Sequence, residues 1–240
     1  MTTTILDTDT LGTAAIDSGA ATELSAATFD TMRHAMVASQ LRTNAVNDQR
    51  VVAAMARVPR EQFLPNDVRS IAYRDTAIAL GGGRYANLPM ATGRLLTEAY
   101  LTATDRVLLI GAATGYTAAV LSEIVGSVVA VESDPALLAI ARTALAGVGN
   151  VELVEDPMQD GHAAGAPYDV LIVDGAVESV PDALIAQVRP GGRATAGIAE
   201  RGLTRLASGR KTDGGFALVA FVDVECVVLP GFATPKPFQF

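Results

Sequence analysis

The residues of this chain best suited to hold a nucleotide-like ligand are a small-residue turn and a carboxylate downstream of it. Gly111 and Gly115 belong to the turn, which directly follows the hydrophobic run 107–110. Glycine lets a backbone turn tightly and lets a ligand approach it closely. Glu132 lies 21 positions after Gly111, at the end of a second hydrophobic run, 127–131. An open α/β sheet places a carboxylate there on the hydroxyls of a ribose, so the spacing predicts a nucleotide-like cofactor at the carboxyl ends of parallel strands.

The spacing of the turn separates two classes of cofactor. A dinucleotide-binding turn reads Gly-x-Gly-x-x-Gly, and its third small residue allows close packing of helix on strand. Tyr116 stands at that third position and Ala113 at the second. The segment Gly111-x-Ala113-x-Gly115 is more similar to the Gly-x-Gly-x-Gly turn of methyltransferases that use S-adenosylmethionine (SAM). The alternative is a tight turn that holds no ligand, and the position of Glu132 favours the cofactor site.

The composition of the chain argues against several other partners. Half of the 240 residues are hydrophobic, enough for one sizeable α/β core with extensions. The net charge of −8 argues against an extended phosphate-binding surface, because affinity for nucleic acids rests mainly on Lys and Arg. No uninterrupted apolar run approaches the ~18 residues that a membrane-spanning helix needs. We therefore expect neither a nucleic acid nor a membrane as a partner.

Cysteine and histidine are too scarce for a disulfide framework or a metal centre. Cys226 is the only cysteine, so the chain can form neither an intrachain disulfide nor a cysteine zinc cluster. His34 and His162 are isolated in the sequence, and we expect each to be an exposed or capping residue. Residues 1–30 contain no Lys or Arg, so the basic segment of a secretory signal is missing. These features predict a cytoplasmic protein without a bound metal.

Elements that alternate between strand and helix must position these residues. The predicted strands are 106–110, 127–131, 151–154, 170–173, 193–199, 203–208 and 216–222, and the predicted helices between them are 117–124, 135–146 and 181–188. This alternation predicts an α/β fold with a doubly wound, mainly parallel sheet of Rossmann-like type. The last three strands follow one another without helices, which predicts an antiparallel C-terminal edge.

The N-terminal part of the chain is predicted to be mainly helical. Helices are expected over 30–42 and 48–58, each with its first residue, an aspartate, as the N-cap. Segment 73–83 lacks a strand pattern and ends in three glycines, which predicts a mobile loop. A helix is expected over 90–103, opened by the proline that precedes it.

Several motifs outside the cofactor turn are specific enough to compare with known families. The most specific are Val58-Pro59-Arg60-Glu61-x-Phe63-x-Pro65 and Ala72-Tyr73-x-Asp75, which shared cofactor chemistry alone would not require. Further segments, between about Met36 and Gly197, are Met36-Val37-x-x-Gln40-Leu41, Asp48-x-Arg50-Val51-x-x-Ala54-Met55, Gly115-Tyr116-x-Ala118-Ala119-Val120-Leu121, Asn150-Val151, Ala166-Pro167-Tyr168-Asp169 and Gly191-Gly192-Arg193. With these motifs the chain resembles the protein-L-isoaspartate O-methyltransferase family. The resemblance implies the fold of SAM-dependent methyltransferases, SAM as cofactor, and carboxyl methylation that repairs isoaspartyl residues in damaged peptides and proteins.

The order of the elements predicts one domain with an N-terminal arm. Residues 28–240 are expected to form the methyltransferase domain. Within it, 28–104 supply a helical extension and the substrate loop, and 105–240 supply the cofactor-binding sheet. Residues 1–27 are rich in Ala, Thr, Ser, Gly and Asp, which predicts a flexible or weakly helical arm, and the alternative is an arm that caps a partner subunit.

The loop that carries catalysis in the family differs in this chain. The family loop reads Gly-Gln-Thr-Ile-Ser-Gln-Pro, and its serine is the residue assigned to catalysis, whereas this chain has Gly83-Arg84-Tyr85-Ala86-Asn87-Leu88-Pro89. Asn87 thus stands at the serine's position, and Arg84, Tyr85 and Leu88 belong to the expected substrate loop. An amide can donate hydrogen bonds to a carboxylate. An acceptor carboxylate is already ionised at neutral pH, so methyl transfer would rest mostly on alignment. Arg84 could bind an acceptor carboxylate with two hydrogen bonds, and the alternative is a solvated loop arginine.

The resemblance assigns further residues to SAM. It implies that Glu132 binds the ribose and that Asp156 accepts from the adenine amino group. Leu109 stands where such methyltransferases usually carry an acidic residue near the methionine end of SAM. Ala113 adds a methyl group where the backbone comes closest to the ligand. Asp174 could compensate by facing the sulfonium or the ammonium, and its alternative is an ordinary Asp-Gly turn.

Three functions therefore stay open. The first is a SAM-dependent methyltransferase that acts on isoaspartyl or a related carboxylate. The second is a methyltransferase of the same fold with another acceptor, because fold does not determine substrate. The third is a family member without cofactor binding that acts as an interaction module. Glu132 and Asp156 favour the first two, whereas Leu109, Ala113 and Asn87 favour the last two.

Overall fold

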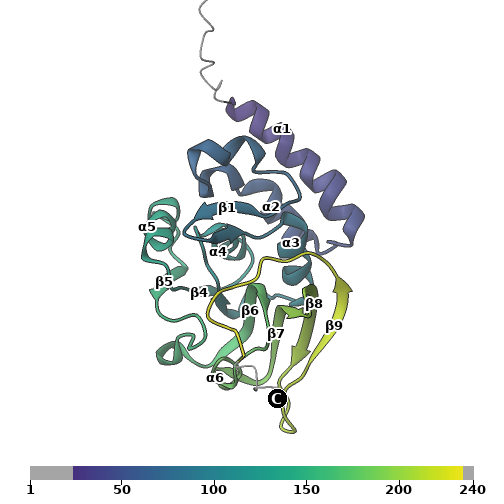
Figure 1. Ribbon diagram of the computed structural model, residues 1–240, viewed down its shortest axis with the longest axis vertical. Coiled ribbons are helices and arrows are strands. Elements are labelled where there is room, and N and C mark those ends of the chain that lie inside the picture. The colour runs from purple at the N-terminus through teal and green to yellow at the C-terminus, as the bar shows by residue number, and fades with distance from the viewer. Residues whose placement is uncertain (1–23, 235–240) are drawn as a thin grey trace, which may run out of the picture.

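A seven-stranded sheet organises residues 24–234, the part of the chain that the computed structural model describes (Figure 1). Its strands are β3 (Arg106–Ile110), β4 (Ser127–Glu132), β5 (Val151–Glu155), β6 (Tyr168–Val177), β7 (Val188–Glu200), β8 (Leu203–Arg210) and β9 (Leu218–Asp223). Their order in the sheet is β5-β4-β3-β6-β7-β8-β9. The first five in this order run parallel, and β8 and β9 pair antiparallel. The predicted α/β class, parallel sheet and antiparallel C-terminal edge are confirmed.

Helices cover both faces of the sheet. They are α2 (Gln49–Arg57), α3 (Pro89–Glu98), α4 (Tyr116–Ser122), α5 (Pro135–Ala144) and α6 (Asp182–Ala186), whereas α1 (Ala26–Met36) packs mainly on the helical turn that follows it. Side chains of β3 alternate between two apolar clusters, because successive residues of a strand point to opposite faces. Val107 and Leu109 join one cluster, and Leu108 and Ile110 join the other. The hydrophobic run is therefore the predicted strand, and it is buried on both faces.

The first helix begins earlier than predicted. The Ser25 side chain accepts a hydrogen bond from the Thr28 N–H at 3.2 Å and caps α1. Asp30, the predicted cap, lies inside the helix and pairs with Arg33, so that prediction is wrong. The helix ends in a π-helical turn over Val37–Leu41. Asp48 does cap α2, since its carboxylate accepts the Arg50 N–H at 2.9 Å.

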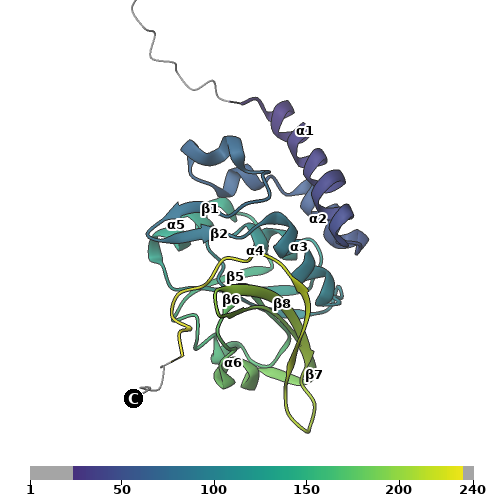
Figure 2. The same ribbon diagram turned by 45° about the vertical axis from the view of Figure 1, so that its right-hand side comes forward.

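The segment before α3 folds into a hairpin where a mobile loop was predicted. Strands β1 (Ile78–Gly81) and β2 (Arg84–Ala86) pair antiparallel around a turn of three glycines, all with positive φ. Ile78 and Leu80 are buried on one face of this hairpin, which explains why it orders. Both views show the hairpin above the sheet, near α4 (Figures 1 and 2).

The C-terminal segment after β9 returns over the same side of the sheet (yellow in Figures 1 and 2). It pairs with the end of β6, where the Ala176 N–H donates to the Val227 carbonyl and the Leu229 N–H donates to the Ala176 carbonyl. Most of the predicted arm 1–27 lies outside the described residues. No helix among the described residues is long and apolar enough to cross a bilayer.

Candidate functional site

The turn after β3 adopts the backbone conformation that its small residues predict. Gly111, Ala113 and Gly115 have φ values of 82°, 48° and 97°. Glycine tolerates this left-handed region, whereas a residue with a side chain is strained there. Gly115 also lets α5 approach, since a Cβ there would lie 2.9 Å from a Leu145 methyl carbon. The turn leads directly into α4.

The carboxylate of Glu132 meets this turn at the end of β4. It is fully buried, with 0% of the residue exposed. It accepts the backbone N–H of Ala113 at 2.8 Å, of Ser133 at 2.9 Å and of Asp134 at 3.0 Å. The two features that the spacing singled out are thus in direct contact.

Arg84 of the hairpin reaches the same carboxylate. Its Nη2 donates to Glu132 Oε2 at 2.9 Å and its Nη1 donates to Oε1, a paired arrangement of two parallel bonds. Arg84 is only 5% exposed, contrary to the alternative of a solvated loop arginine. Its Nε has no hydrogen-bond acceptor among the described residues. The guanidinium therefore lies where a ribose was expected.

Asp174 connects four segments around the site. Its carboxylate accepts Asn87 Nδ2 and Thr92 Oγ1, each at 3.0 Å, and also Thr117 Oγ1. These donors come from the residue after β2, from α3 and from α4. Asp174 lies within β6, so the alternative of an ordinary Asp-Gly turn is wrong.

Asn87, at the position of the family serine, is fully engaged within the protein. Besides its bond to Asp174, its Oδ1 accepts the N–H of Leu88 at 3.1 Å and of Val227 at 3.2 Å. The residue is 5% exposed. Its amide therefore ties the loop to the C-terminal segment and is not directed at solvent.

The other predicted loop residues separate. Tyr85 is 45% exposed, whereas Leu88 is buried in an apolar cluster with Leu95 and Leu206. Leu109, at the position of the expected acid, is likewise fully buried in the core. Leu88 and Leu109 thus serve packing in this structure.

Arg60 is a central residue whose position at the site the sequence alone did not indicate. It is buried beneath the loop, where Nε donates to the Ala72 carbonyl at 2.9 Å and Nη2 donates to the Asn87 carbonyl at 2.6 Å. Its guanidinium lies 4.7 Å from the centre of the Tyr116 ring. Burial lowers the pKa of Arg60 and raises the pKa of Tyr116 to about 12. Arg60 belongs to the Val-Pro-Arg-Glu motif, which indicated the family in the sequence but did not predict the contacts of Arg60 with Asn87 and Tyr116.

Leu229 of the C-terminal segment covers the glycine turn. A Cβ built on Gly111 would lie 3.0 Å from Leu229 Cδ1, and one built on Gly175 would lie 2.6 Å from Leu229 Cγ. The close approach that glycine permits is thus made by this leucine. A cavity of about 20 Å³ remains between the turn, the loop and Leu229, which is room for about one water molecule.

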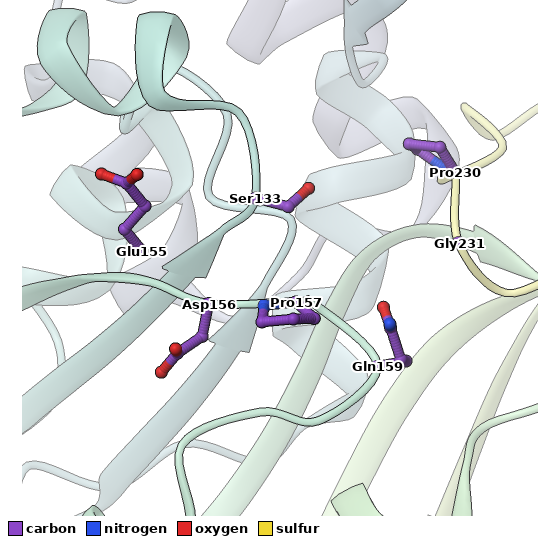
Figure 3. Close-up of a pocket in the computed structure, with 7 residues that line it drawn as sticks. All are labelled: Ser133, Glu155, Asp156, Pro157, Gln159, Pro230 and Gly231. Carbon is purple, nitrogen blue, oxygen red and sulfur yellow. The ribbon is translucent and has the colours of Figure 1, made fainter.

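A larger pocket borders the residues next to this cavity, since Ser133 follows Glu132 and Pro230 follows Leu229 (Figure 3). It has a volume of about 440 Å³, and its lining residues are Ser133, Glu155, Asp156, Pro157, Gln159, Pro230 and Gly231. The Asp156 carboxylate lies 3.5 Å from Nδ1 of His162 and is partly exposed. Asp156, which was predicted to bind the adenine amino group, therefore lines this pocket and not the small cavity around the turn.

Comparison with known proteins identifies the family. The model of the protein-L-isoaspartate(D-aspartate) O-methyltransferase family matches residues 32–230. The chain belongs to this family. It is 39% identical over 170 residues to protein-L-isoaspartate O-methyltransferase 1 of Rhodopseudomonas palustris (strain HaA2), covering 70% of this chain and 69% of that protein. It is 33% identical over 201 residues to the enzyme of Koribacter versatilis (strain Ellin345), covering 83% and 90%.

Solved structures agree with this assignment to the isoaspartate O-methyltransferase family. A protein-L-isoaspartate O-methyltransferase superposes with a TM-score of 0.71 at 26% identity, covering 85% of this chain and 66% of that one. A second structure, from Plasmodium falciparum, has a TM-score of 0.68 at 16% identity, covers 82% and 97%, and supports the fold alone. As a family member, the chain is a SAM-dependent methyltransferase.

Proposed function

We propose that this protein methylates carboxylates with SAM as the methyl donor, and that its acceptors are isoaspartyl residues in peptides or proteins. The observation that carries the proposal is the joint position of Glu132 and the Gly111–Gly115 turn at the carboxyl ends of β3 and β4. Parallel α/β sheets bind nucleotide-like ligands at that edge. Cys226 is a free, buried thiol, which suits a reducing compartment such as the cytoplasm.

The residues present fit one part of SAM and not the rest. The pocket of about 440 Å³, which Asp156 helps to line, has room for an adenine ring. Glu132 is the right group for ribose hydroxyls, but Arg84 already holds it. Leu229 covers the turn where the remainder of the cofactor would pass. The closed arrangement therefore does not accept the whole cofactor.

The protein's own residues would act on the acceptor mainly by position. A carboxylate acceptor is ionised at neutral pH and needs no general base. Alignment and exclusion of water then supply the rate. Asn87 serves as a positioning residue, because its amide is bound to Asp174 and Val227 and holds the loop against the sheet.

A different carboxylate acceptor is the second candidate. The loop lacks the serine and the threonine of the family loop, and both N–H groups of the Asn87 amide are already donated, to Asp174 and to Cys226. We therefore expect slow turnover of isoaspartyl peptides.

Methyl transfer from tritiated SAM tests the proposal. We expect base-labile methyl ester on a peptide with isoaspartate, and none on the same peptide with aspartate. A matched set of peptides with other exposed carboxylates tests the second candidate. No incorporation into any carboxylate, by protein shown to have bound the cofactor, would contradict the proposed function.

A further inference from the structure

We propose that Arg84 competes with the ribose of SAM for Glu132, and that Arg84 and Leu229 together form an internal plug of the cofactor cleft. The inference deepens the proposed function and rests on it, because it concerns the same cleft. In the closed state the plug excludes the cofactor, and the cofactor binds after the guanidinium leaves Glu132.

The carboxylate of Glu132 has no acceptor capacity left in the closed state. A carboxylate offers about four lone-pair sites. Three backbone N–H groups, from Ala113, Ser133 and Asp134, already use them together with the two nitrogens of Arg84. Ribose hydroxyls and the guanidinium therefore exclude one another.

The open state keeps Glu132 satisfied. When Arg84 leaves, the three backbone N–H groups still donate to the carboxylate. The closed state, in contrast, leaves two buried groups that line the same cavity, Arg84 Nε and the Tyr116 hydroxyl, without partners among the described residues. A buried group without a partner costs free energy. These two groups therefore reduce the free-energy advantage of the closed state.

The hairpin that carries Arg84 has room to move. A Cβ added at Gly81 or at Gly83 would meet no atom within 4 Å, and one added at Gly82 would meet only the Asp134 carboxylate, at 3.4 Å, so the turn packs loosely on the body of the protein. Segments of this kind supply the hinges of closing loops. Leu229 is coupled to the same movement, because Asn87 of the loop accepts the N–H of Val227 in the C-terminal segment.

Binding of S-adenosylhomocysteine, the product form of the cofactor, measures the competition directly. Titration calorimetry on the full chain compares the wild type with Arg84→Gln, which removes the charge and the paired bonds. We expect Arg84→Gln to bind about tenfold more tightly or better, because apparent affinity rises with the open fraction. Arg84→Gln combined with Glu132→Gln should lose this gain, since the carboxylate that Arg84 releases is then missing.

A matched control separates the plug from general loosening. Arg193 also forms a largely buried ion pair, with Asp105 at the amino ends of the strands, away from the cleft. Arg193→Gln should lower stability and leave affinity unchanged. For the second half of the plug, Leu229→Ala should tighten binding, whereas Leu184→Ala, another fully buried leucine of the same apolar cluster, should not.

The outcomes are distinct. Equal or weaker binding by folded Arg84→Gln, with the fold checked by circular dichroism, overturns the competition. An equal gain in Arg193→Gln also overturns it. Failure of the proposed function shows elsewhere, as cofactor binding without methyl transfer to any carboxylate.

Discussion

At the scale of single residues, Ala113 accepts backbone strain to make one hydrogen bond. Its φ of 48° lies in the left-handed region. That region costs a residue with a side chain roughly 1–2 kcal/mol. The N–H that this conformation presents donates to the buried Glu132 carboxylate at 2.8 Å. Bonds to a charged acceptor are stronger than neutral ones, so the strain and the bond offset one another.

Ala113→Gly should therefore stabilise the protein by about 1 kcal/mol, since glycine adopts this conformation without strain. Urea unfolding followed by circular dichroism measures the change. Ala112→Gly is the control, because Ala112 is buried next to the turn and has no positive φ. It should be destabilised. A lower midpoint for Ala113→Gly than for the wild type would show that the methyl group packs usefully here.

Leu109→Glu tests a second single position. The family resemblance suggests that an acid there would help bind SAM, but the structure buries Leu109 completely in an apolar cluster. An uncompensated buried carboxylate should cost roughly 3 kcal/mol or more. Leu109→Met should cost less than about 1.5 kcal/mol, because it conserves volume. Similar unfolding midpoints for the two variants would mean that the position is wetter than the structure indicates.

At the scale of elements, local patterns predict well and distant pairings do not. The unit β3–α4–β4 follows from two hydrophobic runs and a small-residue turn, and it brings Glu132 to Ala113 without further information. Arg84 reaches Glu132 through a hairpin whose short strands and three glycines resemble a loop in sequence. Leu229 reaches Gly111 through a C-terminal strand pairing that no local pattern encodes. The contacts of Arg84 with Glu132 and of Leu229 with Gly111 could therefore not be predicted from the sequence.

The C-terminal segment should protect Cys226 from thiol reagents. Burial, followed by the nearby charge of Asp174, raises the pKa of the Cys226 thiol from 9.0 to about 12. Because the thiolate is the reactive form, alkylation of native protein should stay slow up to pH 10 and become fast in urea. The positive control is the double variant Leu203→Cys, Cys226→Ser, because Leu203 is exposed. Rapid native labelling of Cys226 would mean that the segment is already open.

The same shift sets a direction for stability against pH. The pKa of the Cys226 thiol is higher in the folded protein than in the unfolded chain. The thiol therefore does not reduce the free energy of unfolding below about pH 9. As the pH rises from 9 toward 12, the free energy of unfolding falls, because the thiol ionises in the unfolded chain and stays neutral in the folded protein. Cys226→Ser should flatten the fall in stability between pH 9 and pH 10.5, as measured by urea unfolding.

At the scale of the whole molecule, the two ends of the parallel strands differ. The contacts that we propose to break during opening lie at the carboxyl ends, and ion pairs that stay in place lie at the amino ends. Arg84, Asn87 and Leu229 meet at the carboxyl ends of the strands. The pair Arg193–Asp105 and the Asp169 carboxylate, which accepts the Arg106 N–H at 2.8 Å, hold the amino ends. Local opening can therefore occur without loss of the sheet.

Hydrogen exchange should show this division. Arg84→Gln is expected to speed exchange in segments 81–88 and 226–229 and to leave β3 and β4 unchanged. Arg193→Gln should instead act on the amino ends of β6 and β7. Faster exchange across the whole sheet in Arg84→Gln would mean that the ion pair supports global stability and not a local closure.

The Arg84–Glu132 pair also bears on how much cofactor the protein needs. The apparent dissociation constant equals the intrinsic one divided by the fraction of molecules that are open. Every ~1.4 kcal/mol by which the pair favours the closed state raises the half-saturating SAM concentration about tenfold. A protein with a plug of this kind loads over a concentration range that its own ion pair selects. Its occupancy then rises along an ordinary single-site curve whose midpoint is shifted to a higher SAM concentration.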